Sequence, residues 1–186
     1  SVRGRASVAE EDETNNLASG DADATAAAAD LRVIAVAAAP GATSGEPLDV
    51  TWTVRNDGAA AVWEGTQYWR DAVWLSRDPV FDRSRATLLT SVIHQNEDGL
   101  AAGGSYTETA RVILPPGTDG DYFLHVATDV GPFIPVPRGE QLSGSAPDAR
   151  GYYATSVFET TEDPTGNFGR GSLDIAYAEP DLRVTA

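Results

Sequence analysis

The 186-residue sequence contains no cysteine, no lysine and no methionine. Without cysteine, neither disulfides nor a thiolate metal site can hold the fold together. All 13 basic residues are arginine, so chemistry that needs a lysine amine is excluded, including the lysine isopeptide cross-links of some surface pilins. No apolar run approaches the roughly 20 residues that span a bilayer, and we expect no membrane insertion.

Positive charge is also scarce. The 28 acidic residues outnumber the 13 basic ones, which gives a formal net charge of −15. Such a surface repels phosphate backbones, so we expect no nucleic-acid partner. It suits an extracellular or salt-exposed protein, or one that collects divalent cations. The chain begins without a methionine or a leader sequence, and we expect any secretion signal or anchor to lie outside it.

Two pairs of segments recur at nearly one period. "SVAEEDETNN" (residues 7–16) resembles "SVFETTEDPTGN" (156–167), and "AADLRVIA" (28–35) resembles "EPDLRVTA" (179–186). The offsets are 157 − 8 = 149 for the valines and 181 − 30 = 151 for the aspartates. A fixed internal period is typical of tandem arrays. The alternative is that two acidic tails are alike by chance.

The recurrence predicts that the chain is a fragment of such an array. We expect four parts in chain order: residues 1–18 as the tail of a preceding repeat, 19–29 as a linker, 30–167 as one whole module with a Pro-rich insertion at 130–151, and 168–186 as a linker with the first strand of a following repeat. The Gly-rich stretch "GNFGRGS" (166–172) is assigned to the second linker.

Within the module, short runs alternate between apolar and polar residues and are separated by turn residues. In "LDVTWTVRN" (48–56), every second residue from Leu48 to Val54 is apolar and shares one face of a strand. The other expected strands cover residues 31–36, 71–76, 86–93, 105–114, 121–129 and 152–159. About seven short strands without a convincing helix predict an all-β fold, an immunoglobulin-like antiparallel sandwich of two sheets.

Two local features refine this prediction. The turn "PPGTDG" (115–120) precedes Tyr122, as in the tyrosine corner of immunoglobulin-like sandwiches, so we expect Tyr122 to be buried with its hydroxyl bonded to nearby backbone. Tyr122→Phe should then cost about 1 kcal/mol. The four prolines of residues 130–151 predict a long loop, which either docks a partner or covers one end of the sandwich.

The order of several segments resembles a known module. They are "DLRVIAV", "GEPLDVTWTVRNDG", "DAVWLSRDPVFDRSRATLL", "LAAGGSYTETARVILPPGTDGDYFLHVATD" and "VFETTED…N". Together they resemble CARDB, the immunoglobulin-like cell-adhesion-related domain found in bacteria, over about residues 30–167. The resemblance implies a sandwich fold, an extracellular or cell-surface setting and a role in adhesion or spacing. It implies no reaction. Such modules end in an acidic segment, which "VAEEDETNN" (8–16) resembles.

Residues that could carry catalysis are few. The only histidines are His94, expected in a loop near a strand end, and His125, expected within a strand. No serine lies in a nucleophile-elbow pattern, and no Gly-rich phosphate loop follows a strand and opens a helix. We therefore expect no enzyme and no required cofactor.

Calcium is the candidate ligand, because hard oxygen donors in acidic loops suit it. The first candidate site is the set Asp129, Glu159, Glu162 and Asp163, close to the ends of the last two expected strands. The second is Asp71, Asp78 and Asp82. The resemblance partly fails there, because the family tends to have an acid near Arg85, which we expect to pair with Asp82. The cluster of Asp129, Glu159, Glu162 and Asp163 could instead be a solvated acidic rim.

The composition, repeats and resemblance favour a structural or adhesive repeat module of a large bacterial extracellular protein or fibre. Neighbouring copies are the expected partners, joined in tandem or by strand exchange through residues 1–18. The alternative is a carbohydrate- or ligand-binding sandwich that uses Trp63, Tyr68 and Trp69 as an aromatic platform for a cell-surface or matrix glycan. Burial of these three aromatics would remove the support for that alternative.

Overall fold

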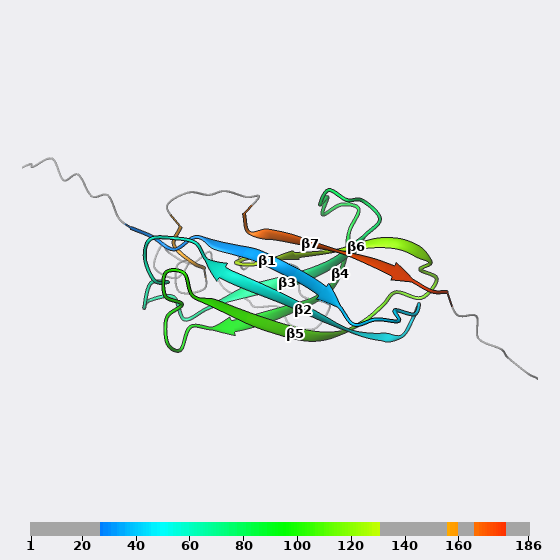
Figure 1. Cartoon of the computed structure of the whole chain (residues 1–186), viewed down its shortest axis with the longest axis horizontal. Coiled ribbons are helices and arrows are strands. Elements are labelled where there is room, and N and C mark those ends of the chain that lie inside the picture. The colour runs from blue at the N-terminus through cyan, green and yellow to red at the C-terminus, as the bar shows by residue number, and fades with distance from the viewer. Residues whose placement is uncertain (1–26, 131–155, 160–165, 178–186) are drawn as a thin grey trace, which may run out of the picture.

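The computed structural model describes residues 27–130, 156–159 and 166–177. These residues form an elongated sandwich of seven strands without a helix (Figure 1). The strands are β1 (Leu31–Ala38), β2 (Pro47–Asn56), β3 (Tyr68–Ser76), β4 (Thr87–Gln95), β5 (Ser105–Ile113), β6 (Gly120–Ala127) and β7 (Phe168–Ile175). The all-β, two-sheet antiparallel prediction is confirmed. No helix in the described ranges is long and apolar enough to cross a bilayer.

The strands form two sheets of unequal size. One sheet has the order β1-β2-β5 and the other the order β4-β3-β6-β7, with antiparallel pairing throughout. In β2 the alternating residues Leu48, Val50, Trp52 and Val54 are buried, as their period predicts. The outer face of the same strand is polar, and Thr51 and Thr53 meet Thr109 and Thr107 of β5 through hydroxyl pairs of 2.9 Å.

Strand β3 is buried on both faces. Trp69, Val73 and Leu75 belong to the main core between the sheets. Ala72 and Trp74 lie on the opposite face, in a second apolar cluster that includes Phe81 from the loop after β3. The rings of Trp74 and Phe81 are 5.0 Å apart. A strand that is covered on both sides has no polar face, which explains why "DAVWLS" is so apolar.

A buried carboxylate joins the two sheets. Asp71 of β3 points into the core and is 1% exposed. It accepts hydrogen bonds from Trp52 Nε1 of β2 at 2.7 Å and from the Tyr106 hydroxyl of β5 at 2.8 Å. Trp69 Nε1 donates to that same hydroxyl at 2.9 Å. Burial raises the pKa of Asp71, while the hydrogen bonds from Trp52, Thr128 and Tyr106 oppose the rise.

Strand β7 corrects the expected domain boundary. Residues 168–175 are not a linker, because β7 pairs with β6 from Gly120↔Ile175 to Ala127↔Phe168. The glycines mark a close approach to β1. A Cβ at Gly169 would lie 2.3 Å from the Val33 side chain, and one at Gly171 would lie 2.8 Å from the Val36 carbonyl oxygen.

Other expectations have mixed outcomes. The opening strand at residues 31–36 is confirmed by β1, and His125 lies in β6 as expected. His94 lies in β4 rather than in a loop. The expected strand at 152–159 is wrong where it is described, because residues 156–158 are not a strand and Glu159 makes only an isolated bridge to Ala29. The described part excludes residues 1–26, 131–155, 160–165 and 178–186. The expected exchange strand (1–18) and the four prolines of the expected insertion therefore lie outside it.

The tyrosine-corner prediction is wrong. Tyr122 is half-buried rather than buried. Its hydroxyl accepts a hydrogen bond from Arg77 Nε at 3.1 Å, and the guanidinium lies 4.5 Å from the ring centroid. Since this partner is an exposed side chain rather than buried backbone, Tyr122→Phe should change the free energy of unfolding by less than about 0.5 kcal/mol.

The contact between β7 and β1 can be tested with Gly171→Ala. The added Cβ would meet backbone, which cannot rotate away, so we expect a loss of about 1–3 kcal/mol in the free energy of unfolding. Urea denaturation measures this loss. Ser172→Ala, at the exposed neighbouring position of β7, is the matched control and should be close to neutral. If both variants were neutral, β7 would not pack closely on β1.

Candidate functional site

The candidate site is the end of the sandwich where β1 begins. We call it the N-terminal pole, and it consists of residues 27–32, 55–63 and 156–159 with Asp129 and Asn167. Figure 1 shows the described chain starting at this pole, and β7 ending at the opposite end of the long axis. The segment 156–159 returns to the pole and meets the start of β1, with a parallel bridge between Ala29 and Glu159.

Asn56, the last residue of β2, organises the pole. Its side chain is fully buried. The Oδ1 atom accepts hydrogen bonds from the backbone N–H groups of Asp30 and Gly58, both at 3.0 Å. The Nδ2 atom donates to the carbonyls of Ala60 at 2.8 Å and Leu100 at 3.0 Å. One amide therefore satisfies backbone groups from three segments that have no ladder partners at this end.

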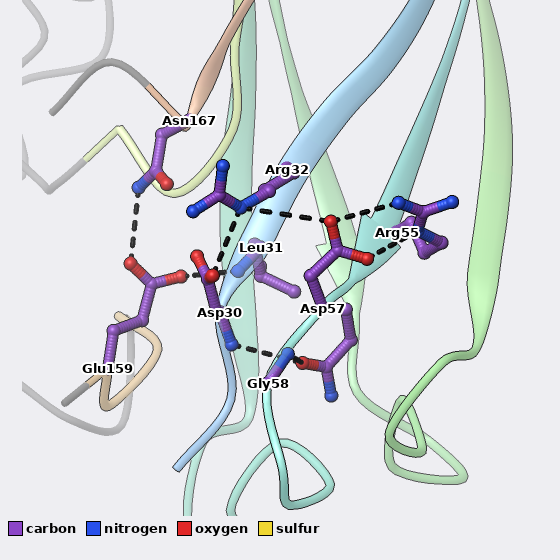
Figure 2. Close-up of polar contacts among 9 residues, drawn as sticks. Asp30, Leu31, Arg32, Arg55, Asp57, Gly58, Glu159 and Asn167 are labelled. Carbon is purple, nitrogen blue, oxygen red and sulfur yellow. Dashed lines mark hydrogen bonds and ion pairs between the residues drawn. The ribbon is translucent and has the colours of Figure 1, made fainter. Parts of the chain in front are cut away.

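Charged side chains line the edge of the pole. Figure 2 shows Arg32 Nε between Asp30, at 3.0 Å, and Asp57, at 3.7 Å, while Arg55 also binds Asp57. The hydrogen bond from Arg55 lowers the pKa of Asp57. These side chains are partly exposed, so solvent screens each pair and its contribution to stability is small.

Two residues of the first predicted cation site lie at this pole. Glu159 Oε1 accepts from the Leu31 N–H at 2.7 Å, and Oε2 accepts from Asn167 Nδ2 at 3.3 Å (Figure 2). Asp129 Oδ2 accepts from the Val157 N–H at 3.0 Å and from Ser156 Oγ at 3.1 Å. Both carboxylates therefore hold the segment 156–159 against the sandwich.

The environment favours the protonated form of these carboxyls. Burial is the main cause that raises the pKa of Asp129 to about 7. The charge of Glu159 adds to this rise, whereas the hydrogen bonds from Val157 and Ser156 oppose it. Burial also raises the pKa of Glu159. Glu162 and Asp163 lie outside the described residues. Among the described residues, no three His, Cys, Asp or Glu side chains are grouped as metal ligands. Calcium at the four-residue site stays a prediction.

The second predicted cation site is not formed. Asp71 lies in the core, as described above. Asp78 pairs with Arg85, with 3.1 Å between Nε and Oδ2. Asp82 instead accepts hydrogen bonds from Ser84 N at 2.9 Å and Ser84 Oγ at 2.7 Å, which lower its pKa. The direct contact expected between Arg85 and Asp82 is therefore not formed, since the guanidinium binds Asp78, and Arg85 acts on Asp82 only through its charge.

The three aromatics of the expected ligand platform do not share one exposed face. Trp69 is fully buried and Tyr68 is half-buried, whereas Trp63 is 54% exposed. Trp63 and Phe158 instead line an open apolar groove of about 510 Å³ with alanines at 27–29, 60 and 61. The sequence does not reveal this groove, because Phe158 lies in an expected strand and the alanine run in an expected linker. Only the folded positions of the three segments reveal it.

The described part of the chain is thus an all-β sandwich domain. Its N-terminal pole, where β1 begins, carries both a cluster of polar contacts and an apolar groove. No protein-family model matches the sequence, and no curated protein matches it. Among solved structures, it is similar to the CARDB domain of a Pyrococcus furiosus protein, described in complex with di-metal ions. That similarity has a TM-score of 0.48 and 14% identity, and covers 83% of this chain and 100% of the other.

Parts of two β-glucosidases are also similar. For β-glucosidase 3B from Thermotoga neapolitana the TM-score is 0.38 at 14% identity, covering 53% of this chain and 14% of the enzyme. For the Listeria innocua enzyme the TM-score is 0.38 at 13% identity, covering 80% of this chain and 16% of the enzyme. The chain spans only a small part of these enzymes. Similarity at these levels identifies neither a ligand nor an activity.

The raised pKa of Asp129 predicts an unusual pH dependence. The carboxyl titrates at about 7 in the folded state and near 3.8 in the unfolded state. Between these values only the folded state keeps the proton, so stability should fall as pH rises from about 4 to 7, by at most about 1.4 kcal/mol per pH unit. Asp129→Asn mimics the protonated carboxyl and should remove this slope.

Urea unfolding at a series of pH values measures the difference between wild type and Asp129→Asn. A residual slope is expected in the variant, since the pKa values of Asp71 and Glu159 are also raised. Asp129 has a φ of 48°, which asparagine and aspartate both tolerate, so the substitution should add no backbone strain. Parallel pH profiles of the two proteins would show that Asp129 does not carry a proton in the folded state.

Proposed function

We propose that this chain is a structural repeat of a bacterial extracellular or cell-surface protein, a β-sandwich spacer that is joined end to end with further copies. The observation that carries the proposal is the position of the two chain ends. The described chain starts at one pole of the long axis and ends at the other (Figure 1). Together with the recurring "DLRV" at residues 181–184, this arrangement suits a linear array.

The chain is bound to the sandwich up to its last described residues. We call this end the C-terminal pole, and it consists of residues 39–44, Asp119, Ala176 and Tyr177. Ala176 donates to the Ala42 carbonyl at 3.0 Å and accepts from the Ser44 N–H at 2.9 Å. Tyr177 N–H donates to Asp119 Oδ1 at 3.3 Å. Because the end of the described chain is bound to the sandwich, it would set the orientation of a copy that follows it.

The composition supports a surface setting. A net charge of −15 and the absence of cysteine suit a protein that stays soluble and needs neither disulfides nor a reducing compartment. We propose no catalysis for this domain, since the buried Asp71 and the half-buried Asp129 and Glu159 each accept hydrogen bonds from groups that hold the fold. Adhesion to a ligand, calcium binding and strand exchange through residues 1–18 are finer parts of the same proposal.

Glycan binding is the alternative, and Trp63 is its remaining support. A sugar platform uses aromatic rings that face solvent together. Trp69 is fully buried and bonded to Tyr106, so it does not serve such a platform. Phe158 lines the groove with Trp63, and a glycan array with wild type and Trp63→Ala tests whether the pair binds sugar.

The spacer proposal is tested with two copies of the chain fused in the repeat register. By the offset of 151, residue 178 corresponds to residue 27 (178 − 151 = 27), so residue 177 of the first copy is followed directly by residue 27 of the second. Small-angle X-ray scattering should give a maximum dimension close to twice that of the single chain. A dimension close to that of one chain, from two copies lying side by side, would contradict the proposal.

A further inference from the structure

The groove at the N-terminal pole leaves a large aromatic side chain in water. Trp63 is 54% exposed and Phe158 is 38% exposed, whereas the other three tryptophans are 4% exposed or less. Alanines 27–29, 60 and 61 complete the lining. Contiguous apolar surface of this kind typically marks a site where another surface binds.

Trp63 is held in a defined position. A Cβ at Gly65 would lie 2.3 Å from the Trp63 ring, so the absence of a side chain at Gly65 lets the ring lie against the loop. The Trp63 carbonyl accepts hydrogen bonds from Thr66 N at 3.0 Å and from Asn96 Nδ2 at 3.2 Å. The groove is therefore formed by a fixed loop, and binding to it requires little ordering.

The length of the connection between copies decides what reaches the groove. Ala28 is fixed at the pole, because its carbonyl accepts from Ala60 N at 3.2 Å. By the offset of 151, its counterpart in a following copy is Glu179 (28 + 151 = 179). Tyr177 is fixed at the C-terminal pole by Asp119. In such an array a single residue separates Tyr177 from the position that corresponds to Ala28 in the next copy.

One intervening residue permits no gap between the poles. Two successive Cα–Cα steps span at most roughly 7.6 Å. The C-terminal pole of one copy must therefore lie directly against the N-terminal pole of the next, beside the alanines that line the groove. Tyr177, which is 50% exposed, lies at the surface that faces it.

We propose that the apolar groove at Trp63 and Phe158 is the docking site for the C-terminal pole of the preceding copy, so that consecutive modules form a rigid joint. This inference rests on the proposed end-to-end array. The offset places Ala26 at the position of Tyr177 in the copy that precedes this one. The side chain at this position thus differs between copies, and the docking partner is the pole as a whole.

The experiment uses the two-copy fusion with one Trp63 reporter. Trp63→Phe is introduced in the first copy or in the second, which leaves the exposed tryptophan in the other. Acrylamide quenching of tryptophan fluorescence then reports the accessibility of each groove, because the remaining tryptophans are buried. We expect the quenching constant of the accessible component to be severalfold lower when Trp63 remains in the second copy, whose groove follows a C-terminal pole.

Inserting a flexible Gly-Ser segment between residue 177 and residue 27 gives the matched control. It keeps both copies and lengthens only the connection, so quenching of the second Trp63 should return to the value of the first. Equal accessibility of the two reporters in the direct fusion would overturn the proposal. If both were open, the poles would not dock, and if both were shielded, the groove would be covered by a segment of its own copy.

Scattering from the same fusion separates this inference from the proposed function. An extended particle with equally accessible reporters would contradict the docking site alone and leave the array intact. A compact particle with two modules side by side would contradict the array itself.

Discussion

The rest of the structure depends on the close contact between the first and the last strand. Gly169 and Gly171 of β7 leave no side chain between β7 and Val33 and Val36 of β1. The parallel bridges Ala29↔Glu159 and Thr43↔Ala176 lie at the two ends of this contact. Because β1 and β7 run in the same direction (Figure 1), the chain enters at one pole and leaves at the other. The entry and the exit of the described chain therefore lie at opposite ends of the sandwich.

Three buried or half-buried carboxyls fix the same geometry. Asp71 joins β3 to β2 and β5 through Trp52 and Tyr106. Asp129 holds Val157 and Glu159 holds Leu31, so the segment 156–159 is bound to the pole at which β1 begins. Each of these carboxyls is satisfied by N–H or O–H donors, which offsets the cost of its burial. Acidic residues here are structural acceptors as much as surface charge.

The sequence predicted the fold where periodicity alone determines it. In β2 every second residue from Leu48 to Val54 faces the core, and this alternation can be read directly from the sequence. The role of β7 was not visible, because the glycines that permit close packing on β1 have the same composition as a flexible linker. The prediction of an aromatic platform is not supported at Trp69, because this residue packs in the core from β3, a strand that is covered on both faces. The groove at Trp63 could not be predicted, since its walls come from three segments whose meeting depends on tertiary structure.

The central claim is that one module is a rigid element whose two connections lie at opposite poles. A chain without cysteine allows a direct test with Ala61→Cys at the N-terminal pole and Tyr177→Cys at the C-terminal pole, both exposed positions. Spin labels at these sites give a distance distribution by pulsed electron paramagnetic resonance. We expect one narrow distribution beyond roughly 30 Å, about the length of the ten-residue strand β2. A broad distribution, or one centred at a short distance, would contradict it.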